Sequence, residues 1–391
     1  MHMVVYAVRI IRKIYKLIFG YQDKVLLISH AVVPGSMGDQ AMLDAAANYL
    51  KKEGFNLSIL YGHKEREVDI RLSGASKIFV LPKSFVNRAK YVHALISSDE
   101  AMITGADVID GIYHGSSIWI DFLQLASDIG VKVRVLGFSF SSYPVKKAVE
   151  QLKDCSNIQF MSRDINSLRR FESYTEQKAK LVADVAFLLE PELSTEEAVN
   201  IQDFILKKKQ EDAVVAGVNV SGHVFSKLDE SALTAFIKTL NFWLEMDEKH
   251  CIILVPHDVR DEIGDLELLR KIYAALERRF SDRVKLLEFP TAWNVKALAG
   301  NFDFAISARM HFTIACMGMG VPALSLVYQD KFEGLEEHFK LDNTTIEPTV
   351  VANPEVFQEE IISFQEKSFA LKNKIKNILP SVIELSKQNF R

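Results

Sequence analysis

Two residues that could bind an anion or move a proton, Arg309 and His311, follow the apolar run Phe304–Ile306. The next apolar run along the chain ends before Tyr328 and Lys331. Both runs have the length of buried parallel strands, whose carboxyl ends form the ligand-binding edge of an open α/β sheet. An arginine fork matches a carboxylate or a phosphate. The sequence therefore predicts a site for a small anion at this edge.

Four of the ten histidines come just after predicted strands: His30, His223, His257 and His311. One histidine in such a position is more often a satisfied loop or core residue than a catalyst, but four in the same topological position are harder to dismiss. If two sheets face each other across a cleft, all four can line it. We expect one or two to take part in chemistry and the others to bind a ligand or orient a neighbour.

A glycine-rich turn, PGSMGDQ at residues 34–40, separates the first predicted strand from the first predicted helix. Gly35 and Gly38 let the backbone approach a ligand closely, and the helix start offers unpaired N–H groups. The motif is not a complete GxGxxG. A tight turn capped by Asp39 explains it equally well, so the sequence leaves both readings open.

A third candidate group contains Asp107 and Asp110, with His114 shortly after them. Either carboxylate could accept a hydrogen bond from a sugar hydroxyl or act as a base. Alternatively, both could shape a turn and cap the following helix.

Arg163 follows another predicted strand and is a second candidate anion clamp. The neighbouring Asp164 more naturally caps the next helix. Asp184 is an acidic residue within an apolar run, and a buried carboxylate requires a partner. We expect that partner to be Arg163.

The composition is that of an ordinary globular protein, with 48% hydrophobic and 25% charged residues. The formal net charge of -4 gives no support to a nucleic-acid partner. The three cysteines show no metal or disulfide spacing, which fits a reducing cytoplasm.

Strand-like and helix-like segments alternate along the chain, and the composition shifts near residues 190–212. This pattern predicts two doubly wound α/β domains. We expect a basic N-terminal segment at 1–20, a Rossmann-like domain at 21–195 and a second at 196–365. A final helix at 366–391 is expected to cross back to the first domain.

Residues 1–20 combine helical apolar spacing with Arg9, Arg12, Lys13 and Lys16. The charges interrupt the apolar stretch too often for a membrane span. The segment also lacks the clean apolar core and the small-residue cleavage site of a signal peptide. The segment can pack on its domain or lie on an anionic membrane. We therefore expect a cytoplasmic protein, with contact at the inner face of the membrane as an open alternative.

The residues resemble the polysaccharide pyruvyl transferase family between about Val25 and Phe339, most specifically in the last block. The matching blocks are Gly35-Ser36-Met37-Gly38-Asp39, Arg163-Asp164 with Ser167, Ala183–Phe187, and Ser307, Arg309, His311, Gly320, Pro322, Tyr328 and Lys331. The chain has Ser36 where the family usually has asparagine. It has Gly105-Ala106-Asp107 where the family usually has a glycine triplet.

The resemblance implies a glycosyltransferase-B-like fold of two Rossmann-like domains with an interdomain cleft. It implies transfer of a pyruvyl group from phosphoenolpyruvate, as co-substrate, to hydroxyls of a sugar in an exopolysaccharide or its lipid-linked precursor. The product would be a pyruvate ketal of the cell envelope. No cofactor is implied, and the sequence shows no metal-ligand cluster.

The resemblance also suggests roles for the candidate residues. Its catalytic candidates are His311, Arg309 and Asp39. Its donor-binding candidates are Arg309, His311, Lys331, Arg163 and Tyr328. Its acceptor-binding candidates are Gly35, Ser36, Gly38, Asp107, Asp110 and His114, and further cleft candidates are His30, His223 and His257.

Two other functions stay open. A nucleotide-sugar glycosyltransferase of the same fold would use Arg309, His311 and Lys331 to hold a diphosphate, and fold alone does not separate it from a pyruvyl transferase. A non-catalytic anion-binding protein of a polysaccharide pathway is the third, although a scaffold would not need these histidines, arginines and aspartates together.

Overall fold

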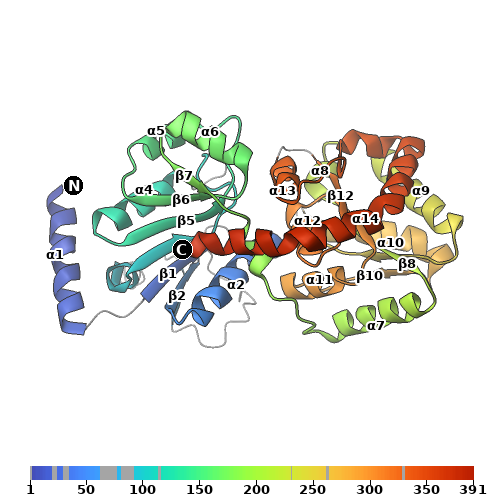
Figure 1. The fold of residues 1–391 in the computed structure, drawn as a ribbon, viewed down its shortest axis with the longest axis horizontal. Coiled ribbons are helices and arrows are strands. Elements are labelled where there is room, and N and C mark those ends of the chain that lie inside the picture. The colour runs from blue at the N-terminus through green and yellow to red at the C-terminus, as the bar shows by residue number, and fades with distance from the viewer. Residues whose placement is uncertain are drawn as a thin grey trace. The chain divides into compact units, whose positions relative to one another are not determined.

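The computed structural model describes residues 2–19, 24–29, 35–61, 77–80, 92–112, 116–229, 231–260, 264–327 and 331–391. The chain forms two compact units (Figure 1). Unit 1 comprises Met1–Pro34, Met42–Leu188 and Ile383–Arg391, and unit 2 comprises Gly35–Ala41 and Leu189–Val382.

Unit 1 contains a parallel sheet whose described strands have the order β3-β2-β1-β4-β5-β6-β7. The strands are β1 (Lys24–Ser29), β2 (Asn56–Tyr61), β3 (Lys77–Val80), β4 (Glu100–Ile103), β5 (Lys132–Phe138), β6 (Ile158–Ser162) and β7 (Ala179–Leu181). Its helices are α1 (His2–Phe19), most of α2 (Met37–Lys52), α4 (Ser116–Asp128), α5 (Lys146–Lys153), α6 (Ile165–Thr175), and the short η1 (Val185–Leu188) and η3 (Gln388–Phe390).

Unit 2 contains a second parallel sheet, whose described strands have the order β10-β9-β8-β11-β12-β13. The strands are β8 (Val214–Val218), β9 (His250–Leu254), β10 (Val284–Leu286), β11 (Phe304–Ser307), β12 (Ala323–Leu326) and β13 (Thr345–Ile346). Its helices are α7 (Glu196–Gln210), α8 (Gly222–Phe225), α9 (Ser231–Met246), α10 (Leu266–Phe280), α11 (Ala292–Ala299), α12 (Met310–Met317), α13 (Lys331–Phe339), η2 (Pro348–Ala352) and most of α14 (Pro354–Lys387).

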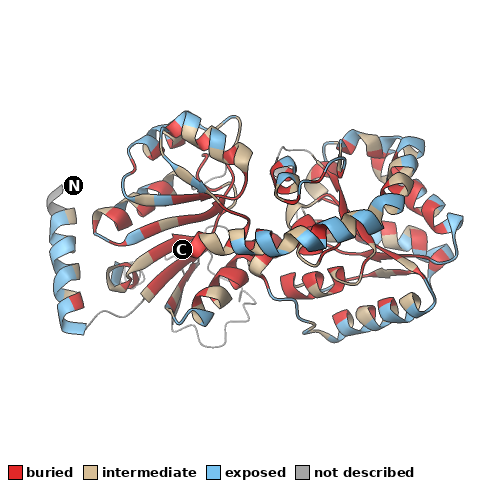
Figure 2. Ribbon diagram, viewed as in Figure 1, coloured by how far each residue is buried: buried red, intermediate tan, exposed pale blue. Residues whose placement is uncertain are grey.

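Both sheets are doubly wound, which confirms the predicted α/β class with two Rossmann-like units. The strand order reverses beside β1 in unit 1 and beside β8 in unit 2. The central strands are continuous apolar runs because helices cover both faces of a parallel sheet. In β9, for example, every residue is buried, and Figure 2 shows buried residues along the strands of both sheets.

The units differ in extent from the expected domains. The boundary falls between Leu188 and Leu189, the glycine-rich turn at Gly35–Ala41 belongs to unit 2, and only Ile383–Arg391 of the C-terminal segment belongs to unit 1.

Hydrogen bonds explain why the C-terminal residues belong to unit 1. Ser386 Oγ donates to the carbonyl oxygen of Asp184 over 2.8 Å. Asn389 Nδ2 donates to that of Ala183 over 2.9 Å. These two side chains are buried, so the bonds tie the last turns of the chain to the loop after β7.

Candidate functional site

The candidate site lies at the carboxyl edge of the unit 2 sheet, where the strand order reverses between β8 and β11. Asn219 follows β8, His257 lies in the loop after β9, and Arg309 follows β11. Loops at a reversal point diverge from the sheet and leave room for a ligand. The fold therefore brings two predicted residues, His257 and Arg309, together with Asn219, which was not predicted.

A hydroxyl network shapes the turn between β11 and α12. Ser307 Oγ donates to the carbonyl oxygen of Arg309 over 2.9 Å and accepts from the Arg309 backbone N–H over 3.3 Å. Thr313 Oγ1 in turn donates to Ser307 Oγ over 2.9 Å. This explains the serine of the S-x-R-x-H block, because its hydroxyl fixes the backbone from which Arg309 and His311 extend.

The guanidinium of Arg309 is held by two carboxylates. Its Nε and Nη2 donate to Asp265 Oδ1 over 3.0 Å and 2.7 Å. Its Nη1 lies 3.5 Å from Asp258 Oδ2. Both carboxylates are buried, whereas 16% of the Arg309 side chain is exposed. Asp265 and Asp258 therefore balance the charge of Arg309, the predicted anion clamp, and fix the direction of its guanidinium.

Asp265 connects the loops that follow three strands. Its Oδ1 accepts from Gly222 N over 3.3 Å, and its Oδ2 accepts from Asn219 Nδ2 over 3.2 Å and from His257 N over 3.1 Å. Asn219 Oδ1 accepts from Ala308 N over 3.3 Å. Burial raises the pKa of Asp265, and the Arg309 cation opposes that shift.

Sequence reasoning missed Asp265, Asn219 and Asp258. Asn219 and Asp258 carried a usable signal, because the first directly follows a strand and the second directly follows His257. Asp265 stands just before α10, where an aspartate is commonly read as a helix cap. Its pairing with Arg309 is a long-range contact that no local pattern announces.

The glycine-rich turn is anchored to the loop after β9. Ser36 forms an antiparallel bridge with Asp258. Met37 N donates to the His257 carbonyl oxygen over 3.1 Å, and Val259 N donates to the Gly35 carbonyl oxygen over 2.8 Å. These bonds explain why the turn belongs to unit 2, beside residues predicted for donor chemistry.

Both turn glycines are required by their surroundings. Gly35 has a φ of +105°, and a Cβ there would lie 3.1 Å from Arg260 Cγ. Gly38 lies against the imidazole of His311, so that a Cβ there would meet its Nδ1 and lie 2.8 Å from its Cγ. The two glycines therefore let the backbone approach protein side chains, Arg260 and His311.

Asp39 lies in the first turn of α2 and is half-buried. Burial raises the pKa of its carboxyl, while His311, the Ser36 hydroxyl and Arg260 act in the opposite direction. The Asp39 N–H donates to Ser36 Oγ over 3.4 Å, so Ser36 supplies the side-chain cap at this helix start. Asp39 thus has an electrostatic relation to His311 beyond any capping role.

His257 is 4% exposed, and neither ring nitrogen has a hydrogen-bond partner within the described part of the chain. Burial lowers its pKa well below the usual value, and His311 and Arg309 lower it further. Its ring centroid lies 6.0 Å from that of Phe312. A buried polar group of this kind calls for a partner such as a ligand or water.

His223 lies on the short helix α8 after β8 and is half-buried. Its carbonyl oxygen accepts from Ser226 Oγ over 3.1 Å. The structure thus places His223 after β8, next to Gly222, whose N–H donates to Asp265 Oδ1 over 3.3 Å.

In unit 1, Arg163 forms a buried network. Its Nη1 donates to Asp184 Oδ2 over 2.7 Å, which confirms the pairing predicted from sequence. Its Nε donates to Ser139 Oγ over 2.7 Å, and its Nη2 lies 3.8 Å from Asp107 Oδ1. Only 2% of the side chain is exposed. This geometry favours an architectural role within unit 1.

The other unit 1 carboxylates also serve the backbone. Asp110 is buried, and its Oδ1 accepts from Ile112 N over 3.1 Å, as in an Asx turn. Asp164 caps α6 by accepting from Ser167 N and Ser167 Oγ, each over 2.7 Å. The capping predicted for Asp164 is confirmed, and Asp110 has the turn geometry that the sequence left as an alternative.

Some predicted residues are outside the described part of the chain. These are His30, His114 and Tyr328. Lys331 opens α13, but its side chain is likewise outside the description.

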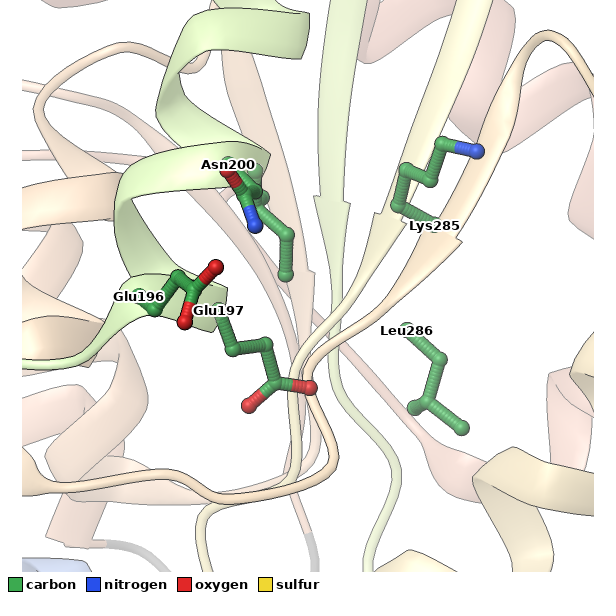
Figure 3. A pocket seen from close by; sticks show the side chains of 6 residues that line it. Glu196, Glu197, Asn200, Lys285 and Leu286 are labelled. Carbon is green, nitrogen blue, oxygen red and sulfur yellow. The ribbon is translucent and has the colours of Figure 1, made fainter.

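A surface pocket of about 490 Å³ lies elsewhere in unit 2, between the start of α7 and β10 (Figure 3). Its lining residues are Glu196, Glu197, Asn200, Ile201, Lys285 and Leu286. The Glu197 carboxylate accepts from the backbone N–H groups of Glu288 and Phe289, over 2.7 Å and 3.0 Å. None of the residues that line this pocket was predicted to belong to the site. The carboxylate of Glu197 is already bonded to the loop at Glu288 and Phe289.

A family model described as polysaccharide pyruvyl transferase matches residues 37–330 of the chain. The matched range includes the second half of the glycine-rich turn, residues 37–40, together with Arg163 and the block from Ser307 to Tyr328. Gly35, Ser36 and Lys331 lie just outside it. A comparison with curated protein sequences gave no match.

Solved structures resemble the whole fold. A UDP-GlcNAc 2-epimerase from Neisseria meningitidis bound to UDP-GlcNAc has a TM-score of 0.58 at 11% identity, covering 93% of this chain and 100% of its own. The same enzyme from Methanocaldococcus jannaschii gives 0.58 at 11% identity, covering 87% and 91%. A glycosyltransferase from Rickettsia africae gives 0.52 at 13% identity, covering 95% and 99%. These similarities identify the glycosyltransferase-B type of fold.

Proposed function

The chain belongs to the polysaccharide pyruvyl transferase family, and we propose that it transfers a pyruvyl group from phosphoenolpyruvate to a sugar. The acceptor is two hydroxyls of a sugar in a polysaccharide or its lipid-linked precursor, and the product is a pyruvate ketal. The observation that carries the proposal is the arrangement of Arg309 and His311 at the start of α12, beside Gly38 and Asp39.

The reaction needs one proton and one leaving group. A proton added to the methylene carbon of phosphoenolpyruvate turns it into a methyl group and makes C2 electron-deficient. One sugar hydroxyl then forms a bond to C2, and the second hydroxyl displaces phosphate from the same carbon. Of the two hydroxyl protons, one balances the proton on the methyl group and the other leaves with phosphate.

His311 and Asp39 are the residues that we assign to proton transfer. An imidazole can both donate and accept a proton, and a general acid or base contributes roughly 100- to 10,000-fold in rate. The raised pKa of Asp39 brings its carboxyl nearer to the range in which it can exchange protons at working pH. The electrostatic coupling between the two groups supports their action as a pair.

Anion binding is assigned to Arg309 together with the N-terminus of α12. Arg309 has five N–H donors, and Asp265 engages the edge formed by Nε and Nη2. Its Nη1 lies 3.5 Å from Asp258 Oδ2, so the two carboxylates together set the direction of the guanidinium. The positive end of a helix dipole lies at the same turn and favours a carboxylate or phosphate. Lys331 is proposed as a further donor ligand because it matches the family signature.

The decisive experiment combines purified protein with phosphoenolpyruvate and candidate soluble or lipid-linked glycans. Phosphate release and the mass of the glycan report turnover. His311→Ala should lower kcat by roughly 100- to 10,000-fold. His338→Ala is the matched control, because it removes a half-buried histidine of the same unit that is not among the candidate site residues, and it should leave kcat within a few-fold.

The rival function is nucleotide-sugar transfer, suggested by the UDP-sugar enzymes that share the fold. Thermal shift separates the two, since a ligand stabilises the state that binds it. Phosphoenolpyruvate should raise the melting temperature, and UDP-sugars should not. Stabilisation by UDP-sugars alone would replace the proposed function with the rival.

A further inference from the structure

Two basic side chains of the N-terminal helix α1, Arg12 and Lys16, contact other parts of unit 1, whereas Arg9 and Lys13 are exposed. Arg12 Nη2 donates to the Ser98 carbonyl oxygen over 2.7 Å. Lys16 forms an ion pair with Asp99 and is only 6% exposed. Val5 and Val8 of α1 also pack, partly buried, against the core of unit 1. The inner side of the helix therefore combines basic and apolar contacts.

The side of α1 that faces solvent is largely apolar. Exposed large side chains occupy Tyr6, Ile10, Ile11, Ile14, Leu17 and Ile18, and Leu17 is 83% exposed. Residues 6, 10, 14 and 17 follow one side of a helix. Figure 2 shows the exposed residues along the length of α1. A contiguous apolar surface of this kind marks an interaction site rather than ordinary scatter.

The charge of α1 identifies the surface that it fits. The helix contains Arg9, Arg12, Lys13 and Lys16 and no acidic residue. Arg9 and Lys13 are exposed along with the apolar side chains. This combination is complementary to an anionic lipid surface, where apolar groups enter the acyl boundary and exposed cations meet headgroup phosphates.

Among the described helices, none combines the length and apolarity needed to cross a membrane. We propose that α1 binds peripherally to an anionic bilayer, with the apolar side formed by residues 6, 10, 14 and 17 in the lipid. The proposal is independent of the reaction, because none of these residues belongs to the candidate site.

Co-sedimentation of the full-length protein with lipid vesicles tests this inference. The protein should sediment with vesicles that mix phosphatidylglycerol into phosphatidylcholine, and much less with phosphatidylcholine alone. Binding should weaken as salt rises, since salt screens the headgroup charge. Absence of binding to the anionic vesicles would overturn the proposal.

Two variants locate the contact. Leu17→Glu should lower vesicle binding on the order of tenfold or more, because it places a charge where an apolar side chain enters lipid. The matched control is Ile118→Glu on α4, which adds the same charge at a 71% exposed position of unit 1 and should bind as wild type. An equal loss in both variants would assign the effect to net charge and contradict the proposal.

Lys13→Gln should weaken binding on the order of fivefold, as expected for one cation near an anionic surface. Lys271→Gln on α10 is its control, because Lys271 is also exposed and lies in unit 2. Light scattering after gel filtration examines self-association. If wild type forms a dimer that Leu17→Glu converts to monomer, and neither protein binds vesicles, a second copy is the occupant and the bilayer proposal fails.

Discussion

Gly38 packs its Cα against the imidazole of His311, leaving no space for a Cβ between them. The contact joins the start of α2 to the start of α12 within unit 2. The contact explains why residue 38 of the turn is glycine: any larger residue would collide with the His311 ring. The neighbouring Asp39 is electrostatically coupled to the same imidazole.

Gly38→Ala should therefore damage activity while sparing the fold. Alanine is the better helix former by about 1 kcal/mol. This gain offsets the cost of moving the His311 ring, so the free energy of unfolding should change little. The added Cβ displaces the His311 ring, and a misplacement of about 1 Å can cost on the order of 100-fold in rate. Steady-state phosphate release gives kcat, and circular dichroism gives the melting temperature.

A double-mutant cycle shows whether this effect passes through His311. In a His311→Ala background the ring is absent, so Gly38→Ala should add little further loss. Independent, additive losses from the two changes would show that Gly38 acts by another route.

Asp265→Asn should destabilise unit 2 strongly. Asp265 is fully buried and accepts two bonds from Arg309, so loss of its charge leaves a cation short of its main partner. Breaking a buried pair from one side costs about 3 kcal/mol or more. Urea denaturation measures the loss, and kcat/KM at a temperature where both proteins are folded reports the effect on Arg309.

The control uses a similar fork at the surface. Arg270 donates through Nε and Nη2 to Glu288 Oε2 over 3.0 Å and 2.6 Å, but 45% of the Arg270 side chain is exposed. Glu288→Gln should cost far less stability than Asp265→Asn, because solvent screens an exposed ion pair. Comparable losses in the two variants would show that burial does not set the strength of the Asp265 contact.

His257 should make the protein sensitive to acid. Its folded-state pKa lies below the unfolded value of about 6.5, so the unfolded chain binds the proton more readily. The stability contributed by neutral His257 is present above that value and is lost as the pH falls from there toward the folded-state pKa. For one such group the slope is at most about 1.4 kcal/mol per pH unit.

Denaturation of wild type and His257→Gln across this range measures the contribution. Wild type should lose more free energy of unfolding than the variant as the pH drops below about 6.5. Parallel curves for the two proteins would mean that His257 does not carry the predicted proton linkage.

Ala106→Gly should stabilise the protein. Ala106 has a φ of +105°, a region that glycine adopts freely and that costs other residues about 1–3 kcal/mol. The greater flexibility of glycine in the unfolded chain offsets part of this, so we expect a gain of about 1 kcal/mol. Urea denaturation checks it.

Ala179→Gly in β7 is the matched control, because Ala179 is not among the described residues with positive φ. There glycine should lower the free energy of unfolding by roughly 0.5–1 kcal/mol. If Ala106→Gly lowers the free energy of unfolding by a similar amount, the backbone at Ala106 is not strained.

The sequence determined the two Rossmann-like units, because alternating buried strands and amphipathic helices are local patterns. It also located Arg309 and His311 at a strand end and predicted the pairing of Arg163 with Asp184. The last prediction succeeded because an acidic residue in an apolar run has few ways to be satisfied, and an arginine stood at the end of a neighbouring strand.

Tertiary structure alone decided what surrounds these residues. Asp265 reaches Arg309, and Gly38 reaches His311, only because the loops after β8, β9 and β11 converge at the reversal of strand order and the turn at residues 35–39 pairs with one of them. Such contacts join residues that are far apart in the chain, and they depend on how separate elements pack. Residue type and spacing along the sequence indicate which interactions a side chain can make, whereas the packing of the elements determines which partner it contacts.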